Sequence, residues 1–160
     1  MLKITPTTEP DSLTNAKSYA FKLLSRRSYS RTELAQRLRD KGFNLDICQD
    51  AVRLLEEYGY VDDSQLAARE VERCLKEQRL GPRRLQLRLR QRGIAPEIIN
   101  QVMVSVNPEA VYSSCLQEAR KKLAALPNID SERKLARLGS FLLRRGFDLE
   151  CVNRCLREIF

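Results

Sequence analysis

Apolar residues recur at intervals of three and four along most of the chain, from about Leu13 to Phe160. No segment keeps the strict alternation of apolar and polar residues that a half-buried strand requires. Spacings of three and four place side chains on one face of a helix. The pattern therefore predicts an all-α protein.

Glycine and proline divide this pattern into eight or nine short helices. A glycine commonly ends a helix in the left-handed conformation, and a proline commonly occupies the first helical position. Capping residues agree with these limits: Ser30 and Glu33 form a capping-box pattern, and Asn107 and Asp148 precede later apolar segments. The interruptions are Gly42, Gly59, Gly81-Pro82, Gly93, Asn107-Pro108, Pro127 and Gly146.

One segment occurs three times at a period of about fifty residues, as 33–43, 84–94 and 137–147. Its matching positions are two leucines four apart, a glycine, and an aromatic or β-branched residue after the glycine. The similarity continues into the following helix. The matching sets are Leu34/Leu85/Leu138, Leu38/Leu89/Leu142, Gly42/Gly93/Gly146 and Phe43/Ile94/Phe147.

Each repeated helix pair follows another amphipathic segment, so one unit contains three helices. We expect a flexible tail over residues 1–11 and three helical repeats over residues 12–60, 61–107 and 108–160. A unit of this size buries too little apolar surface to be robust alone. The repeats are therefore predicted to stack into an elongated, curved array.

The chain carries 29 Lys and Arg against 21 Asp and Glu, a formal net charge of +8. This balance favours a nucleic acid or an acidic protein surface as the partner, although a generally solvated basic surface would have the same composition. Charge alone does not choose among these.

Several classes of function are disfavoured by what the sequence lacks. There is no histidine, the commonest general base and zinc ligand, and no glycine-rich phosphate loop. We expect no catalytic residue, no metal site and no cofactor. The five cysteines show no metal-ligand spacing and are predicted to be reduced thiols, with Cys151 and Cys155 four apart on one helical face.

No apolar run is long enough to span a bilayer, and the first residues lack the pattern of a signal peptide. We therefore expect a cytoplasmic protein that does not enter a membrane. A monomer is the default expectation.

The densest positive charge lies between Glu77 and Glu97, where no acidic residue intervenes. At 100° per residue, three of its arginines lie on one flank of the Leu85/Leu89 stripe and two on the other. Arginine suits bidentate contact with phosphate or carboxylate, so a partner is expected to supply the counter-charge. The candidate residues are Arg79, Arg83, Arg84, Arg88, Arg90 and Arg92, with Arg144 and Arg145 as a second site.

Structural explanations compete at some of these positions. Lys41, Arg92 and Arg145 each precede the repeated glycine, where a cation favours the helix C-terminus. A solvated helix face would also accommodate the arginines, and acids are interspersed among the smaller basic clusters. In the Gly59–Asp63 turn, the adjacent Asp62 and Asp63 are assigned to capping the helix that follows.

Together, the repeat and three of its segments resemble the RecX family. The segments are GYVDD at 59–63, LGPRRLQLRLRQRGI at 80–94 and FLLRRGF at 141–147, and the resemblance extends from about Ala16 over nearly the whole chain. Two positions depart from the family pattern. Arg88 replaces an acidic residue, which makes the helix more basic, and Leu66 replaces an aromatic residue.

The resemblance implies a regulator without an active site, which lodges in the groove of the RecA nucleoprotein filament. It would hinder ATP turnover, strand exchange and cleavage of the SOS repressor, and thereby modulate homologous recombination and DNA repair. Direct contact with single- or double-stranded DNA stays open. The alternatives are a stand-alone DNA- or RNA-binding helical protein and a helical adaptor for an acidic protein.

Overall fold

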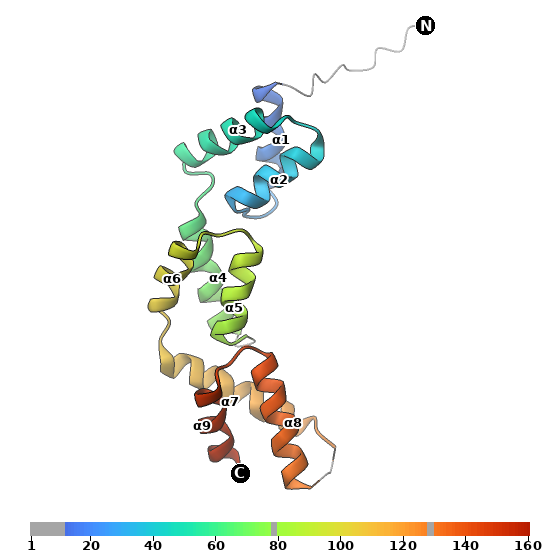
Figure 1. The fold of residues 1–160 in the computed structure, drawn as a ribbon, viewed down its shortest axis with the longest axis vertical. Coiled ribbons are helices and arrows are strands. Elements are labelled where there is room, and N and C mark those ends of the chain that lie inside the picture. The colour runs from blue at the N-terminus through green and yellow to red at the C-terminus, as the bar shows by residue number, and fades with distance from the viewer. Residues whose placement is uncertain (1–11, 78–79, 128–129) are drawn as a thin grey trace, which may run out of the picture. The chain divides into compact units, whose positions relative to one another are not determined.

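The computed structural model describes residues 12–77, 80–127 and 130–160. Within these ranges it contains nine α-helices and no strand, so the all-α prediction is confirmed (Figure 1). The predicted tail over residues 1–11 lies outside the described residues. The helices are α1 Leu13–Leu24, α2 Arg31–Lys41, α3 Leu45–Glu57, α4 Asp63–Glu77, α5 Pro82–Gln91, α6 Pro96–Val104, α7 Pro108–Ala124, α8 Ser131–Arg144 and α9 Leu149–Ile159.

The predicted caps form at three helix starts. The Ser30 hydroxyl accepts a hydrogen bond from the Glu33 N–H at 3.0 Å, and the Ser30 N–H donates to the Glu33 carboxylate at 3.0 Å. This reciprocal pair is the capping box of α2. Asn107 and Asp148 accept backbone N–H bonds at the starts of α7 and α9.

The prediction for the two adjacent aspartates is only half right. Asp62 caps α4 by accepting the Gln65 N–H at 2.8 Å. Asp63 instead accepts the Arg31 N–H at 3.0 Å, at the start of α2. Burial raises the pKa of Asp63 although this bond opposes the shift. Thus a residue on α4 caps a helix of the preceding repeat.

Contacts divide the chain into two compact units. The first comprises the described residues 12–66 together with residues 92–94. In it, α1, α2 and α3 pack against one another around a closed core. The core side chains include Ala16, Ala20, Leu34, Leu38, Cys48, Ala51 and Leu55, all fully buried.

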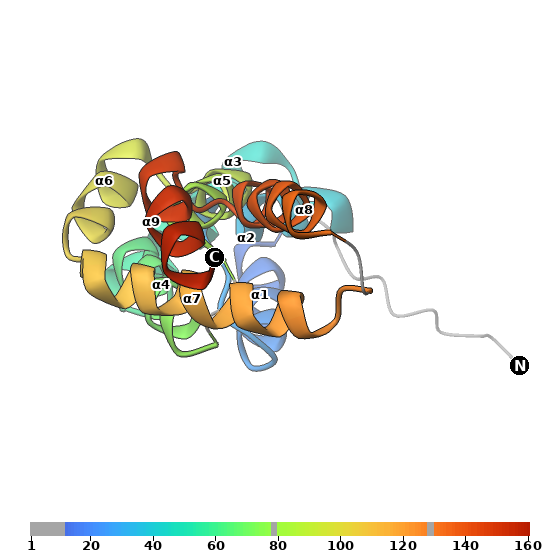
Figure 2. The ribbon, with the colours of Figure 1, turned by 90° about the horizontal axis from the view of Figure 1, so that it is seen from below.

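The second unit comprises residues 67–91 and 95–160. Here α5 packs on α6, and α7, α8 and α9 pack against one another (Figure 2). The matched leucines are buried in all three repeats, with at most 3% exposure, as the sequence predicted. Among the largest buried side chains around the last three helices are Leu138, Leu142, Phe147 and Val152.

The start of α2 binds the chain segment that follows α5, inside the first unit. The hydroxyls of Ser30 and Thr32 donate to the carbonyls of Arg92 and Gly93, the latter at 3.0 Å. The Arg92 guanidinium donates to both oxygens of Glu33, at 3.2 and 2.8 Å, and to the Ser28 carbonyl at 2.9 Å. These bonds satisfy carbonyls that a helix end leaves without an intrahelical donor.

The start of α5 makes the equivalent junction with the end of α8, inside the second unit. The N–H groups of Gly81 and Arg83 donate to the carbonyls of Arg145 and Gly146 at 2.8 and 3.1 Å. Gly146 has φ +91°, and a Cβ built there would lie 2.5 Å from both the Cβ and the backbone nitrogen of Arg84. The glycine therefore provides both the turn and the close approach of the two chain segments.

Substitution of Gly146 tests this close approach, and Gly42 is its control at the matching position of the repeat. Gly42 has φ +105°, but no atom would lie within 4 Å of its Cβ. We expect Gly42→Ala to cost about 1–2 kcal/mol of unfolding free energy through backbone strain alone. Gly146→Ala should cost a further ~1–3 kcal/mol through steric overlap. Urea unfolding followed by circular dichroism measures both, and equal losses would contradict the close contact.

Substitution of Glu33 tests the first junction. Burial disfavours ionisation of this carboxyl, but bonds from Arg92 and the Ser30 N–H outweigh burial and hold the pKa of Glu33 below its ordinary 4.5. A carboxyl whose pKa is lower in the folded state stabilises the fold above its unfolded pKa, and this contribution disappears as pH falls through the folded pKa. Glu33→Gln should therefore lower the free energy of unfolding by about 2 kcal/mol near neutral pH.

The difference between wild type and Glu33→Gln should shrink as pH falls below 4.5 in urea titrations. Glu72→Gln serves as the control, because the Glu72–Lys76 pair is exposed. Its effect should be much smaller at neutral pH. A pH-independent difference for Glu33→Gln would show that the ion pair with Arg92 is not its cause.

Candidate functional site

The structure separates the predicted arginines into exposed residues without an ion pair and residues held by carboxylates. Arg83, Arg84 and Arg90 on α5 are exposed, and none pairs with a carboxylate of the described chain. Helix α5 buries Leu85 and Leu89, which leaves its flanks for these guanidinium groups. Arg79 lies outside the described residues.

Arg88 is not unopposed, contrary to the expectation from its local sequence. Its Nε lies 3.5 Å from the Glu70 carboxylate on α4. The same carboxylate receives Arg73 at 2.9 Å, and it is only 13% exposed. The sequence around Arg88 contains no acid, so local spacing could not reveal this pair. The counter-charge comes from Glu70, which is distant in sequence but close in space.

Arg92 also has its counter-charge inside the chain, in the bidentate pair with Glu33. Its side chain is 13% exposed. The structural explanation from sequence was that a cation at this position favours the helix C-terminus. The position of Arg92 agrees with it, but the sequence did not identify Glu33 as the partner. The available signal was Glu33 itself, because a capping-box carboxylate lies at a helix start where a second donor can reach it.

Arg145 is the counterpart of Arg92 in the third repeat, and it too is held by a carboxylate. Its Nη2 donates to Glu118 on α7 at 2.8 Å, and the Glu118 side chain is 7% exposed. The guanidinium also lies 5.3 Å from the Phe141 ring centroid. An acid surrounded by Ser114, Cys115 and Ala119 on the buried face of α7 was the sequence signal for this pair.

Arg144 differs from Arg145 in its surroundings. It is exposed and pairs with no carboxylate of the described chain. Since the first turn of α5 bonds to the end of α8, Arg83 and Arg84 belong to a helix start that adjoins the helix end bearing Arg144. The structure thus brings together two clusters that the sequence treated as separate sites.

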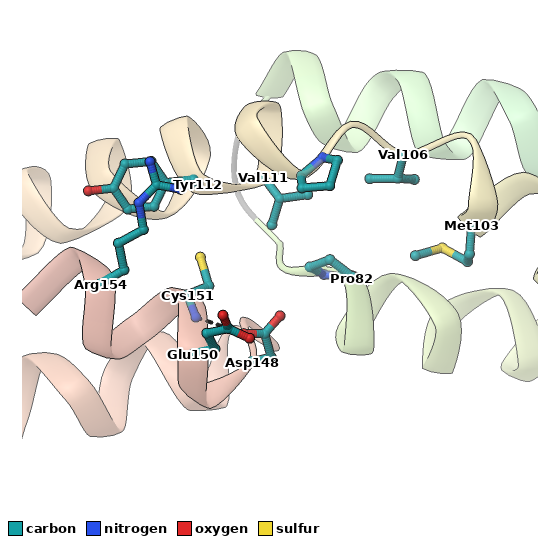
Figure 3. A pocket seen from close by; sticks show the side chains of 10 residues that line it. Pro82, Met103, Val106, Val111, Tyr112, Asp148, Glu150, Cys151 and Arg154 are labelled. Atoms are coloured by element: carbon teal, nitrogen blue, oxygen red, sulfur yellow. Dashed lines mark hydrogen bonds between the residues drawn. The ribbon is translucent and has the colours of Figure 1, made fainter.

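A cavity of about 340 Å³ lies elsewhere in the second unit, between α5 and α6 on one side and α7 and α9 on the other (Figure 3). Arg154 stacks on the Tyr112 ring at 3.8 Å and pairs with Glu109 at 2.9 Å. Its charge is therefore neutralised. The other lining residues are mainly apolar or acidic: Pro82, Met103, Val106, Pro108, Val111, Asp148, Glu150 and Cys151.

Three thiols lie together beside this cavity. Hydrogen bonds with Cys151 and Cys155 raise the pKa of the Cys115 thiol, while the bond with Cys115 lowers the pKa of Cys151. All five cysteines are free thiols, and only Cys151 is not buried. The described residues contain no group of three His, Cys, Asp or Glu side chains suited to a metal ion.

None of the helices in the described ranges is both long and apolar enough to cross a membrane.

Family models match the chain in three consecutive spans. They are the first, second and third three-helix domains of RecX, and they match residues 16–54, 62–103 and 109–156. The matched spans follow the order of the repeats found in the sequence.

Curated relatives give the same result over most of the chain. A regulatory protein RecX from Caldanaerobacter subterraneus is 33% identical over 88% of this chain and 68% of its own length. One from Amycolatopsis mediterranei is 33% identical over 89% of this chain and 82% of its own length.

Solved structures agree on the fold. RecX from Lactobacillus salivarius superposes with a TM-score of 0.82 at 18% identity, over 91% of this chain and 95% of its own. A second RecX structure gives 0.84 at 20% identity, over 89% and 72%. The three matched domains and the two relatives at 33% identity show that this chain belongs to the RecX family of regulatory proteins.

Proposed function

We propose that this chain binds the RecA nucleoprotein filament and restrains it without catalysing a reaction of its own. The observation that carries the proposal is the group of exposed arginines without an ion pair in the described chain, in a member of a family of regulatory proteins. These are Arg83, Arg84 and Arg90 on α5, with Arg144 at the end of α8.

The charge on α5 favours an anionic partner whatever the family of the chain. Like charges on one short helix repel one another, and a partner that supplies anions relieves the repulsion. A filament on DNA offers phosphate groups and acidic side chains along a repeating surface. Binding across successive protomers would hinder filament growth, ATP hydrolysis, strand exchange and stimulated cleavage of the SOS repressor.

The paired arginines have a different role in this proposal. Arg88, Arg92 and Arg145 hold helices together, and they reach a partner only at the cost of an internal ion pair. We therefore assign the binding surface to Arg83, Arg84, Arg90 and Arg144. The limits predicted for the three repeats and their elongated, curved arrangement stay predictions, as does cytoplasmic localisation.

DNA-dependent ATP hydrolysis by the cognate RecA tests the function directly. We expect inhibition when this chain is added well below one copy per recombinase protomer, because one bound regulator would affect several protomers of a filament. Filament length by electron microscopy should fall in parallel. Unchanged hydrolysis and filament length, together with salt-dependent DNA binding in the absence of recombinase, would instead favour a stand-alone nucleic-acid-binding protein.

The triple substitution Arg83→Ala, Arg84→Ala and Arg90→Ala tests the surface. We expect the concentration for half-maximal inhibition to rise at least about tenfold, which corresponds to about 1.4 kcal/mol of binding free energy. The matched control is Arg37→Ala, Arg120→Ala and Arg157→Ala, which removes the same charge from exposed positions on other helices. Helicity should be unchanged in both. Equal loss in the two variants would show that net charge, not this surface, determines inhibition.

A further inference from the structure

A cleft lies in the third repeat, between α7 and α8, and its lining differs chemically from that of the cavity in Figure 3. Its volume is about 440 Å³. It is lined by Lys122, Leu126, Ala136, Arg137, Ser140 and Arg144. Three of the six lining residues are cations, one is a hydroxyl donor, and none is an acid.

Within the part of the chain that the structure describes, the cations of this cleft form no ion pair with a carboxylate. Lys122 Nζ lies 5.5 Å from the Phe141 ring centroid, a contact that positions the ammonium group without neutralising it. Arg137 and Arg144 are exposed, and neither forms an ion pair with a carboxylate of the described chain. Neighbouring cations outside the cleft do form such pairs: Lys121 with Glu118, Arg120 with Glu158, and Arg133 with Asp130.

The donors on α8 form a line. Residues 137, 140 and 144 are separated by three and four positions, so they share one face of the helix. Seven residues span about 10 Å along a helix axis, so Arg137 and Arg144 are far enough apart to contact different phosphates of one strand.

We infer that the cleft between α7 and α8 binds the phosphodiester backbone of DNA directly, a step that deepens the proposed function and rests on it. Arg137 and Arg144 contact phosphate oxygens, Lys122 contributes from α7, and the Ser140 hydroxyl donates a hydrogen bond. Leu126 and Ala136 supply the apolar wall that a sugar ring contacts. The cleft is thus a DNA-contacting site in the third repeat.

A polyanion fits this arrangement better than an acidic protein segment. A nucleic-acid strand supplies several anions at fixed spacing, so one ligand satisfies all three cations at once. A protein segment with three adjacent carboxylates would have to overcome their mutual repulsion. No acidic residue lines the cleft, so no carboxylate there would repel a phosphate group.

The experiment measures binding of the full chain to a fluorescent oligothymidylate, without recombinase, over a range of salt concentrations. The test variant is Arg137→Gln with Arg144→Gln. We expect roughly tenfold weaker binding at low salt, and a slope of log K against log salt smaller by about 1.4, since each phosphate contact on a single strand contributes ~0.7. The charge-matched control, Arg120→Gln with Arg157→Gln, should change the slope much less.

A second variant tests the site without removing any cation. Ser140→Glu places a carboxylate among the three cations at an exposed position, where folding should tolerate it. We expect it to weaken oligothymidylate binding at least as much as the double arginine variant. Circular dichroism confirms that the helices remain.

Three outcomes would overturn the inference. They are no oligothymidylate binding by the wild-type chain, equal loss in the cleft and control variants, and cleft-dependent binding to polyglutamate but not to the oligonucleotide. The proposed function is judged separately by RecA ATP hydrolysis. Inhibition of hydrolysis with no direct DNA binding would refute this site alone, whereas cleft-dependent DNA binding with no inhibition would refute the function alone.

Discussion

Much of the structure depends on one interaction, in which the start of a repeat's middle helix contacts the glycine turn that ends the middle helix of the next repeat. A helix start presents N–H groups without intrahelical partners, and a helix end presents carbonyls in the same condition. Contact between the two gives these carbonyls their donors and brings opposite ends of the helix dipoles together. The junction occurs once in each unit, with hydroxyl donors at Ser30 and Thr32 and with backbone donors at Gly81 and Arg83. Contact this close requires glycine at the turn.

The arginine before each of these glycines forms an ion pair with a carboxylate of another helix. Arg92 binds Glu33 at the start of α2, and Arg145 binds Glu118 on α7. The acids differ in position, so the repeat preserves the cation but obtains its partner in two ways. Arginines at such sites stabilise the fold, and removing one would leave a carboxylate that is at most 22% exposed without its shorter ion pair. A ligand that binds either arginine must therefore first break its internal ion pair.

The proposed function consequently rests on the exposed arginines that form no ion pair within the described chain. Exposed guanidinium groups on α5 adjoin the end of α8, and the α7–α8 cleft extends the basic surface into the third repeat. The cavity beside Cys151 has a different character, because acids and a neutralised arginine surround its apolar wall. The proposed contact with DNA phosphates and the proposed restraint of a filament both use the first surface.

The sequence by itself determined the helical class, the limits of most helices, the threefold repeat and the buried leucines. These features follow from local spacing, since a period of three and four, a glycine stop and a capping residue act within a few positions. The tertiary structure decided which of the described arginines have carboxylate partners and where Asp63 acts. Glu33 and Arg92 are 59 positions apart, and Glu118 and Arg145 are 27 apart, so only packing could bring them together. Electrostatic pairing depends on distance in space, and no local pattern encodes that distance.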